Sequence, residues 1–367
     1  MLLKKLSVLN FKNCSELNID LSDDVNCFLG NNGEGKTNLL DAIYYLSFCK
    51  SYFNPIDSQN IKHDEPFFVL EGIYQQGNKE EKVNCGLKRS QKKTVKFNKK
   101  TYDRLADHIG KIPLVMISPM DVLLIIEGSE GRRKFIDGIV SQYDKSYLSN
   151  LLSYNKALHH RNLLLKSFWL NRNFDAASLE IWDEQLVKYG NQIFESRKKF
   201  VEDFTPIFQK YYTTLSNDFE KVSLNYVSQL VDANFHDLLT NNLDKDKTNH
   251  YSNFGIHKDD LEFLIGDLPL KKFGSQGQQK TYLLALKLAQ AELITEISNK
   301  KVIFLLDDIF DKLDETRMKQ LLTIVGNGNF GQIFITDTSL TRIPTILTQE
   351  KINFRAYKIK NREATDV

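Results

Sequence analysis

A short glycine-rich run near the N-terminus constrains the fold of this chain more than any other feature. Residues Gly30-Asn31-Asn32-Gly33-Glu34-Gly35-Lys36-Thr37 fit the phosphate-binding pattern G-x-x-x-x-G-K-[ST] without a mismatch. A strand-like run, residues 25–29, precedes them, and a helix-like run, residues 38–46, follows. In such a loop main-chain N–H groups surround phosphate oxygens, Lys36 reaches the β- and γ-phosphates, and the Thr37 hydroxyl ligates Mg²⁺. We therefore predict an α/β fold that binds a nucleoside triphosphate at this loop.

An apolar strand followed by two acids supplies the second half of the expected ATP site. Residues 302–306 are strongly apolar, and Asp307 and Asp308 follow them directly. Asp307 is expected to hold Mg²⁺, directly or through water, and Asp308 to polarise the water that attacks the γ-phosphate. Lys36 and Asp307 are 271 positions apart (307 − 36), which is too far for a compact P-loop kinase or small GTPase. The separation indicates a nucleotide-binding domain that is split by an insertion.

Two further stretches favour an ATPase of the ABC type. The run Ser275-Gln276-Gly277-Gln278-Gln279-Lys280 fits the signature S-x-G-x-x-[KR] at the start of a helical segment, and residues 310–314 match a D-loop. We expect Ser275, Gln276 and Gly277 to contact the γ-phosphate of ATP. In ABC-type heads the signature serine contacts nucleotide on the other protomer, so this resemblance implies a composite site. ATP would then hold two copies of the chain together as a homodimer, and hydrolysis would release them.

Composition and charge narrow the possible functions. The chain is 41% hydrophobic and 26% charged, which is ordinary for a globular protein. The formal net charge is only +2, so binding to nucleic acid needs a local basic surface. The sequence has neither a run of about 18 apolar residues nor a signal-peptide pattern, so we expect no membrane partner. Its four cysteines lack metal-binding spacing, which favours a reduced, cytoplasmic protein with buried thiols.

The pattern changes along the chain and predicts three parts. Residues 1–120 are rich in strands and form the N-terminal part of the ATPase head, and residues 121–245 form an inserted helical arm. Residues 246–367 return to strand patterns and complete the head with the signature motif and the acidic strand. Within the arm, Pro206 is expected to interrupt the helical run, and the polar residues 235–250 are expected to form a loop.

Six stretches, spread over nearly the whole chain, match more than the ABC pattern. They are Asn10-Phe11-Lys12-Asn13 and residues 35–47, 118–122, 128–137, 154–164 and 255–261. In order, they resemble N-F-[RK]-N, G-K-T-N-x-L-E-A-I-x-x-L-S, S-P-x-D-L, [SG]-P-x-x-R-R-x-F-L-D, Y-x-x-A-L-x-x-R-N-x-L-L and G-P-H-R-D-D-L. These are motifs of the RecF family, bacterial recombination-mediator ATPases related to the heads of SMC proteins and Rad50. The last four are not general ABC features, which makes the resemblance specific.

The resemblance implies a weak, DNA-dependent ATPase that works as a clamp. RecF-like proteins bind double-stranded DNA as ATP-dependent dimers, at gaps and at single-strand/double-strand junctions. There they help RecO and RecR to load RecA for recombinational repair, replication restart and the SOS response. The resemblance also implies that Lys12 and Asn13 approach the nucleotide. Residues 331–338 lack the switch histidine of ABC proteins, so we expect Thr336 or Asp337 to sense the γ-phosphate and hydrolysis to be slow.

Three other functions fit parts of the pattern. A defence-system or nuclease-associated ATPase head usually carries another catalytic domain, but only about 50 residues follow position 314. A transporter subunit would carry the switch histidine, and a catalytically dead, nucleotide-gated protein would not need intact acids after the buried strand. The basic stretches 88–93, 99–100 and 132–134 are open to two interpretations, phosphate contact or ordinary solvent-exposed charge.

Overall fold

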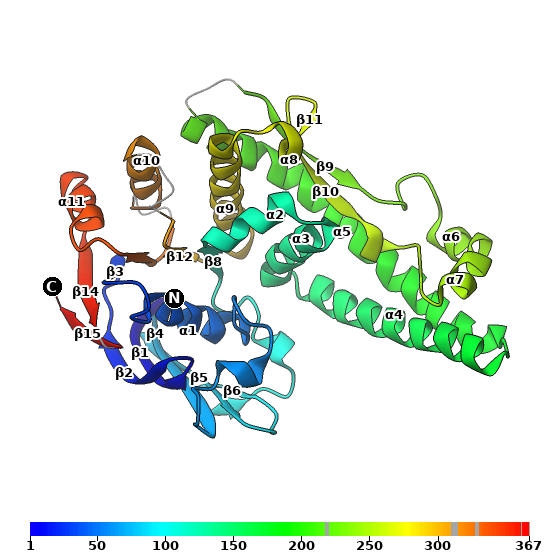
Figure 1. The fold of residues 1–367 in the computed structure, drawn as a ribbon, viewed down its shortest axis with the longest axis horizontal. Helices are drawn as coiled ribbons and strands as arrows, with labels where there is room; N and C mark the ends of the chain where they lie inside the picture. The colour runs from blue at the N-terminus through cyan, green and yellow to red at the C-terminus, as the bar shows by residue number, and fades with distance from the viewer. Residues whose placement is uncertain (217–219, 310–314, 327–329, 361, 367) are drawn as a thin grey trace. The chain divides into compact units, whose positions relative to one another are not determined.

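The chain forms two compact units in the computed structural model, which describes residues 1–216, 220–309, 315–326, 330–360 and 362–366 (Figure 1). Unit 1 comprises Met1–Asp121 with Leu286–Val367, and unit 2 comprises Val122–Ala285. The sequence-based division differs at its second boundary, because it placed residues 246–285 in the head. By contacts these residues belong to unit 2, since strand β10 (Asp260–Ile265) pairs with strand β9 (Val222–Val227) of the insertion.

A six-stranded sheet carries the nucleotide loop of unit 1. Its order is β15-β14-β3-β13-β12-β8, and all neighbours are parallel except β14 and β15. The strands are β3 (Val25–Leu29), β8 (Leu114–Ile117), β12 (Ile303–Asp307), β13 (Ile333–Asp337), β14 (Phe354–Lys360) and β15 (Glu363–Asp366). Every residue of β3, β8, β12 and β13 is buried, which explains their continuous apolar runs. Because carboxyl ends of parallel strands share one edge, the loops after β3, β12 and β13 converge there.

A second, antiparallel sheet of unit 1 covers the first helix. Its order is β2-β1-β4-β5-β6-β7. The strands are β1 (Leu2–Phe11), β2 (Cys14–Asp20), β4 (Phe67–Gln76), β5 (Lys79–Lys88), β6 (Thr94–Phe97) and β7 (Lys100–Thr101). Helix α1 (Lys36–Phe48) contacts strands of both sheets, and its Tyr45 ring meets Phe11 and Phe68 edge to face at 5.8 and 5.4 Å between ring centroids. This packing fixes the N-terminus of α1, where the phosphate loop ends.

The remaining elements of unit 1 surround the two sheets. The helices are α10 (Glu315–Gly326), α11 (Arg342–Gln349) and the second half of α9 (Gln276–Ser298), whose first half belongs to unit 2. The 3₁₀ turns are η1 (Asp57–Asn60), η2 (Leu105–Asp107) and η3 (Pro119–Val122), and the last residue of η3 belongs to unit 2. Lys287 anchors α9, because its ammonium lies 2.6 Å from Asp121 Oδ1 and donates to the carbonyl oxygen of Met116 at the end of β8. All four cysteines are free and buried, as expected.

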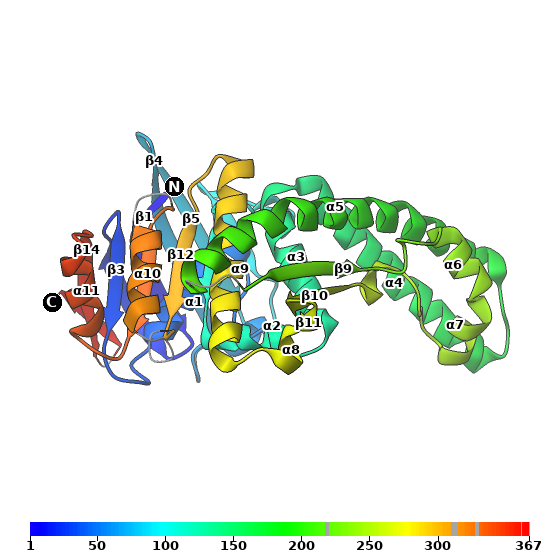
Figure 2. The ribbon, with the colours of Figure 1, turned by 90° about the horizontal axis from the view of Figure 1, so that it is seen from above.

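Unit 2 is dominated by two long helices that lie side by side (Figure 2). These are α4 (Lys145–Asn171) and α5 (Ala176–Ser216). The other elements are α2 (Leu123–Ile126), α3 (Ser129–Tyr143), α6 (Phe235–Asn241), α7 (Leu243–Asn249), η4 (Ile256–Lys258), α8 (Leu270–Phe273) and a three-stranded sheet of β9, β10 and β11 (Leu268–Pro269). Within the described residues, no helix has both the length and the apolar character that crossing a bilayer requires.

Two local expectations were wrong. Helix α5 continues through Pro206, because the flanking turns bury Phe204 and Phe208 while Pro206 itself is exposed. Residues 235–250 form helices α6 and α7 instead of a loop. The Asn234 side chain caps α6 by accepting a hydrogen bond from the His236 N–H at 2.9 Å. These helices are short and polar, so the sequence contains no apolar periodicity that would predict them.

Candidate nucleotide-binding site

The phosphate loop has a backbone that only glycine adopts readily. Gly30, Gly33 and Gly35 have φ values of 152°, 83° and 103°. A Cβ at Gly30 would lie 2.3 Å from the carbonyl oxygen of Ile359 on β14, so a side chain cannot fit there. Gly35 is the N-cap of α1, so the first N–H groups of the helix, which have no partner within the helix, lie at the end of the loop. The geometry is that of an anion-binding loop at a helix N-terminus.

Lys36 lies inside this loop. Its ammonium donates to the carbonyl oxygens of Gly30 at 2.7 Å and Asn31 at 2.8 Å, and only 6% of the residue is exposed. Burial lowers the pKa of Lys36, while the charges of Asp308, Asp307 and Asp337 oppose that shift. A buried ammonium that bonds only to neutral carbonyls within its own loop suits an anionic ligand, because phosphate oxygens would give it charged partners.

The two halves of the predicted site meet at Asp307. The Thr37 hydroxyl donates to Asp307 Oδ1 at 2.9 Å, and the Thr336 hydroxyl donates to the same oxygen at 2.8 Å. Only 3% of Asp307 is exposed, and this burial raises the pKa of its carboxyl group. The carboxylate of Asp307 on β12 therefore joins the first turn of α1 to β13, and the two predicted Mg²⁺ ligands, Thr37 and Asp307, are in contact.

Asp308 follows in an unusual backbone conformation. Its φ is 48°, in the left-handed region that aspartate tolerates better than most residues. Its N–H donates to the Thr336 hydroxyl oxygen at 2.9 Å, so one threonine positions both acids of the pair. Strained backbone of this kind is often found where a side chain must be aimed at a ligand. The role of Asp308 in polarising the attacking water stays a prediction.

The other candidate γ-phosphate sensor, Asp337, forms an internal ion pair. Its buried carboxylate accepts hydrogen bonds from the Arg342 guanidinium, with Nε to Oδ2 at 2.9 Å, and its carbonyl oxygen accepts from the Gly30 N–H at 3.2 Å. Arg342 was missed in the sequence, because an arginine five positions beyond a strand end has no distinctive pattern. The pair ties α11 to the end of β13 beside the phosphate loop.

Lys12 and Asn13 reach the loop in different ways. Asn13 donates to the carbonyl oxygen of Gly33 at 3.4 Å and accepts from Asn38 at 2.6 Å, so it lies directly against the loop and α1. Lys12 instead pairs with the fully buried Asp41 of α1 at 2.5 Å. Asn38 was not predicted, although the G-K-T-N stretch contains it.

The signature segment forms the N-terminus of α9 in unit 2. The Ser275 hydroxyl oxygen accepts a hydrogen bond from the Gln278 N–H at 3.2 Å, and the Gln278 side chain accepts from the Ser275 N–H at 2.7 Å. This reciprocal pair is a capping box, which leaves the first N–H groups of the helix, from Gln276 and Gly277, at its open end. The predicted contacts of these residues with nucleotide remain predictions. The expected D-loop, residues 310–314, lies outside the described residues.

The residues of the loop fit ATP and Mg²⁺. Within the described ranges, no group of three or more His, Cys, Asp or Glu could hold a metal ion. Mg²⁺ commonly binds to one or two protein ligands together with phosphate oxygens and water, which Thr37 and Asp307 satisfy. The bound ion would neutralise charge on the transferred phosphate. Lys36 would hold the β- and γ-phosphates, and Asp308 would accept a hydrogen bond from the attacking water.

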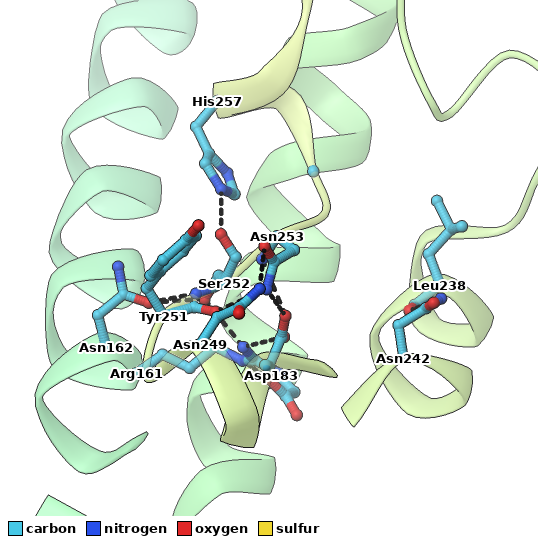
Figure 3. Close-up of polar contacts among 12 residues, drawn as sticks. Arg161, Asn162, Asp183, Leu238, Asn242, Asn249, Tyr251, Ser252, Asn253 and His257 are labelled. Carbon is cyan, nitrogen blue, oxygen red and sulfur yellow. Dashed lines mark hydrogen bonds and ion pairs between the residues drawn. The ribbon is translucent and has the colours of Figure 1, made fainter. Parts of the chain in front are cut away.

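Two of the stretches that resemble RecF, residues 154–164 and 255–261, lie in unit 2, and Figure 3 shows Arg161, Asn162 and His257 from them among the polar contacts of that unit. Arg161 of α4 is fully buried and pairs with Asp183 of α5 at 2.5 Å and with the fully buried Asp246 of α7 at 2.6 Å. It also donates to the Ser252 hydroxyl oxygen at 2.9 Å, and Ser252 in turn bonds to Asn162. The network therefore joins both long helices to α7 and to the segment before residue 255.

The basic run 132–134 also has structural partners. Arg132 binds both carboxylate oxygens of Asp260 at 2.7 and 2.8 Å, and Arg133 donates to the carbonyl oxygen of Asp259 at 2.6 Å. Lys134 pairs with Glu130 one helical turn away. These contacts favour an internal role for the two arginines over direct phosphate binding.

His257 gives unit 2 a predicted pH dependence. Its Nδ1 accepts from the Tyr154 hydroxyl at 2.8 Å and its Nε2 donates to the Ser252 carbonyl at 3.1 Å, which is the neutral form. Burial lowers the pKa of His257 from 6.5 to about 4. Between these values the unfolded chain binds a proton that the folded chain does not, so this residue reduces stability as pH falls below 6.5. The loss at pH 5 is about 2 kcal/mol.

The measurement is urea unfolding of the wild type and His257→Gln at pH 7.5 and at pH 5. We expect the wild type to lose about 2 kcal/mol more stability than the variant between the two pH values. Equal losses in both proteins would show that His257 does not titrate in this way.

Comparisons with known proteins agree with these features. The model of the RecF/RecN/SMC N terminal domain matches residues 2–351. The chain is 49% identical to the DNA replication and repair protein RecF of Phocaeicola vulgatus, over 100% of this chain and 98% of that one. It is 51% identical to the RecF of Flavobacterium johnsoniae, over 98% and 100%.

Solved structures give the same answer for the fold. A structure of the recombination mediator protein RecF with ATP matches with a TM-score of 0.90 and 31% identity, over 100% of this chain and 97% of that one. An Smc head domain from Pyrococcus furiosus matches with a TM-score of 0.58 and 15% identity over 100% and 96%, which shows a shared fold only. The predicted ABC-type ATPase head with an inserted helical arm is confirmed. Because the family model and full-length relatives agree, this chain belongs to the RecF family.

Proposed function

We propose that this protein is an ATP-dependent clamp on DNA, with weak DNA-dependent ATPase activity, that acts in recombinational DNA repair. The observation that carries the proposal is the contact between the Thr37 hydroxyl and Asp307 Oδ1, 2.9 Å apart although 270 positions separate them. Relatives named DNA replication and repair protein RecF and solved structures of RecF with ATP support it.

In this proposal ATP joins two copies of the chain. Lys36, Thr37 and Asp307 of one copy hold the nucleotide and its Mg²⁺, and Asp308 activates water. Ser275, Gln276 and Gly277 of the partner copy contact the γ-phosphate, so neither copy has a complete site by itself. Hydrolysis removes the shared phosphate contacts, which weakens the dimer and releases DNA.

The DNA and protein partners follow from the family. We propose that the clamp binds duplex DNA beside gaps and single-strand/double-strand junctions in the cytoplasm. There it acts with RecR and RecO to load RecA, which supports replication restart and the SOS response. A structure described as RecF in the RecFOR pathway supports the choice of protein partners.

The test is binding of a fluorescent duplex with a single-stranded gap, measured by anisotropy with ATP–Mg²⁺, with ADP–Mg²⁺ and without nucleotide. We expect tight binding with ATP only, and we expect Ser275→Arg to lose it while still binding ATP. Equal binding under all three conditions would contradict an ATP-dependent clamp.

A further inference from the structure

Positive charge is concentrated in one short part of unit 1. Residues 82–102 contain eight lysines and arginines and no aspartate or glutamate. They are Lys82, Lys88, Arg89, Lys92, Lys93, Lys96, Lys99 and Lys100. Because the whole chain has a formal charge of only +2, all other residues together carry −6. The near-neutral total therefore hides a strongly basic segment.

The fold displays this segment at the free edge of the antiparallel sheet. Strands β5, β6 and β7 are the last three in the sheet order, and β5 and β6 are labelled in Figure 1. A tight turn with the left-handed residues Asn98 and Lys99 joins β6 to β7. Five lysines on this edge are exposed and have no carboxylate within 4 Å among the described residues. They are Lys88, Lys92, Lys96, Lys99 and Lys100, and we call them the edge lysines.

The other cations of the segment have internal partners. Lys82 pairs with Glu71, Lys93 pairs with Asp57 at 2.7 Å, and Arg89 donates to the carbonyl oxygen of Glu65 at 2.9 Å. The edge lysines are therefore the part of the segment that is free to meet a ligand. Five exposed ammonium groups in one short segment, none paired with a carboxylate of the described residues within 4 Å, repel one another, and a polyanion relieves that repulsion.

The surface formed by residues 82–102 and their neighbours also contains two depressions. Lys88, Arg89, Lys92 and Lys93 line a depression of about 930 Å³ that also contains Asp57 and Asp103. Lys100 and Lys111 line a neighbouring depression of about 280 Å³ that also contains Asp103 and Asp107. Within residues 79–111 no large hydrophobic side chain is exposed. Apolar groups in the two depressions include the exposed Ile56 and the half-buried rings of Phe97 and Tyr102. The edge lysines carry exposed charge without a carboxylate partner in the described part of the chain, which suits a ligand with several phosphates.

We propose that the edge lysines bind the sugar–phosphate backbone of double-stranded DNA, without reading its sequence. This inference rests on the proposed function and assigns the surface of the head that contacts DNA. Duplex DNA has the highest charge density among the nucleic acids the protein is proposed to meet, and side chains that contact only phosphates give sequence-independent binding. Each lysine that contacts a phosphate contributes about 0.9 to the slope of log affinity against log salt concentration.

The test compares two full-length variants with the same loss of charge. The first is Lys88→Gln/Lys92→Gln/Lys96→Gln/Lys100→Gln. The matched control neutralises four exposed lysines elsewhere, Lys198→Gln/Lys199→Gln on α5 and Lys358→Gln/Lys360→Gln on β14. Duplex affinity is measured with ATP–Mg²⁺ at several salt concentrations. Mass with ATP–Mg²⁺ is measured in parallel, to show that each variant folds and dimerises as the wild type does.

We expect the edge variant to bind duplex at least about 10-fold more weakly than the control, with a salt slope smaller by about 2 to 4. Equal affinities and slopes in the two variants would overturn this inference and leave the proposed function intact. A wild type that binds no duplex under any nucleotide condition would instead refute the proposed function itself.

Discussion

Replacing Lys36 with methionine is expected to lower ATP turnover by at least about 100-fold, the usual cost of losing one preorganised charge-stabilising donor. The ammonium is held inside the loop by Gly30 and Asn31, so it is aimed at the ligand before the ligand binds. Methionine has a similar length and no charge. It therefore removes the contact with phosphate while filling the same space. We also expect ATP binding to weaken by at least about 10-fold.

The fold should tolerate this change. Lys36 makes its two bonds within the loop, and its burial already disfavours the charged form, so we expect the unfolding free energy to change by less than about 2 kcal/mol. The control is Lys358→Met, which removes the same charge from an exposed position on β14. Turnover is measured by phosphate release with duplex DNA present. Full turnover by Lys36→Met would exclude this loop as the hydrolysis site.

Replacing Arg161 with methionine is expected to destabilise unit 2 by about 3 to 5 kcal/mol, because it leaves a buried charge without its partner. Asp246 is fully buried and would lose its bond to Arg161 Nη1, and Ser252 would lose a donor. The melting temperature of unit 2 should fall by about 10 °C. Thermal unfolding followed by circular dichroism measures the shift.

A second substitution separates charge from packing. Arg161→Met combined with Asp246→Leu removes both buried charges, so we expect part of the lost stability to return. Lys166→Met, on the exposed face of the same helix, should change the melting temperature by less than about 2 °C. If the double variant melts at a lower temperature than Arg161→Met, the buried charge of Asp246 is not the cause of the loss.

The sequence-based predictions match the structure best where the residues that bind ligand and the residues that set the secondary structure form one continuous sequence motif. The phosphate loop needs glycines, a strand before it and a helix after it, so residues 25–48 could be predicted closely. Buried parallel strands are continuous apolar runs, which made β12 and β13 easy to recognise. Helix α7 could not be predicted, because its buried residue is Asp246, and a polar helix of seven residues has no periodicity to detect. Its partner Arg161 lies 85 positions away, and no local pattern reveals that pairing.

In the nucleotide site, too, residues that belong to a sequence motif were predicted, and residues whose partners lie far away in the sequence were not. Thr37 and Asp307 were predicted as Mg²⁺ ligands because each belongs to a recognised motif. Arg342 and Asn38 were missed because their roles depend on partners that only the fold brings near, Asp337 and Asn13. The role of Ser275 depends on a second copy of the chain, which the sequence of one copy cannot display.

The measurement that tests the ATP-dependent dimer most directly is mass in solution by light scattering. It is made for the wild type and Ser275→Arg, each with ATP–Mg²⁺ and without nucleotide. We expect the wild type to double its mass with ATP–Mg²⁺, and we expect Ser275→Arg to bind ATP but keep the mass of one chain. A wild type that stays a single chain with ATP–Mg²⁺ bound, or a Ser275→Arg that dimerises as well as the wild type, would contradict the shared site.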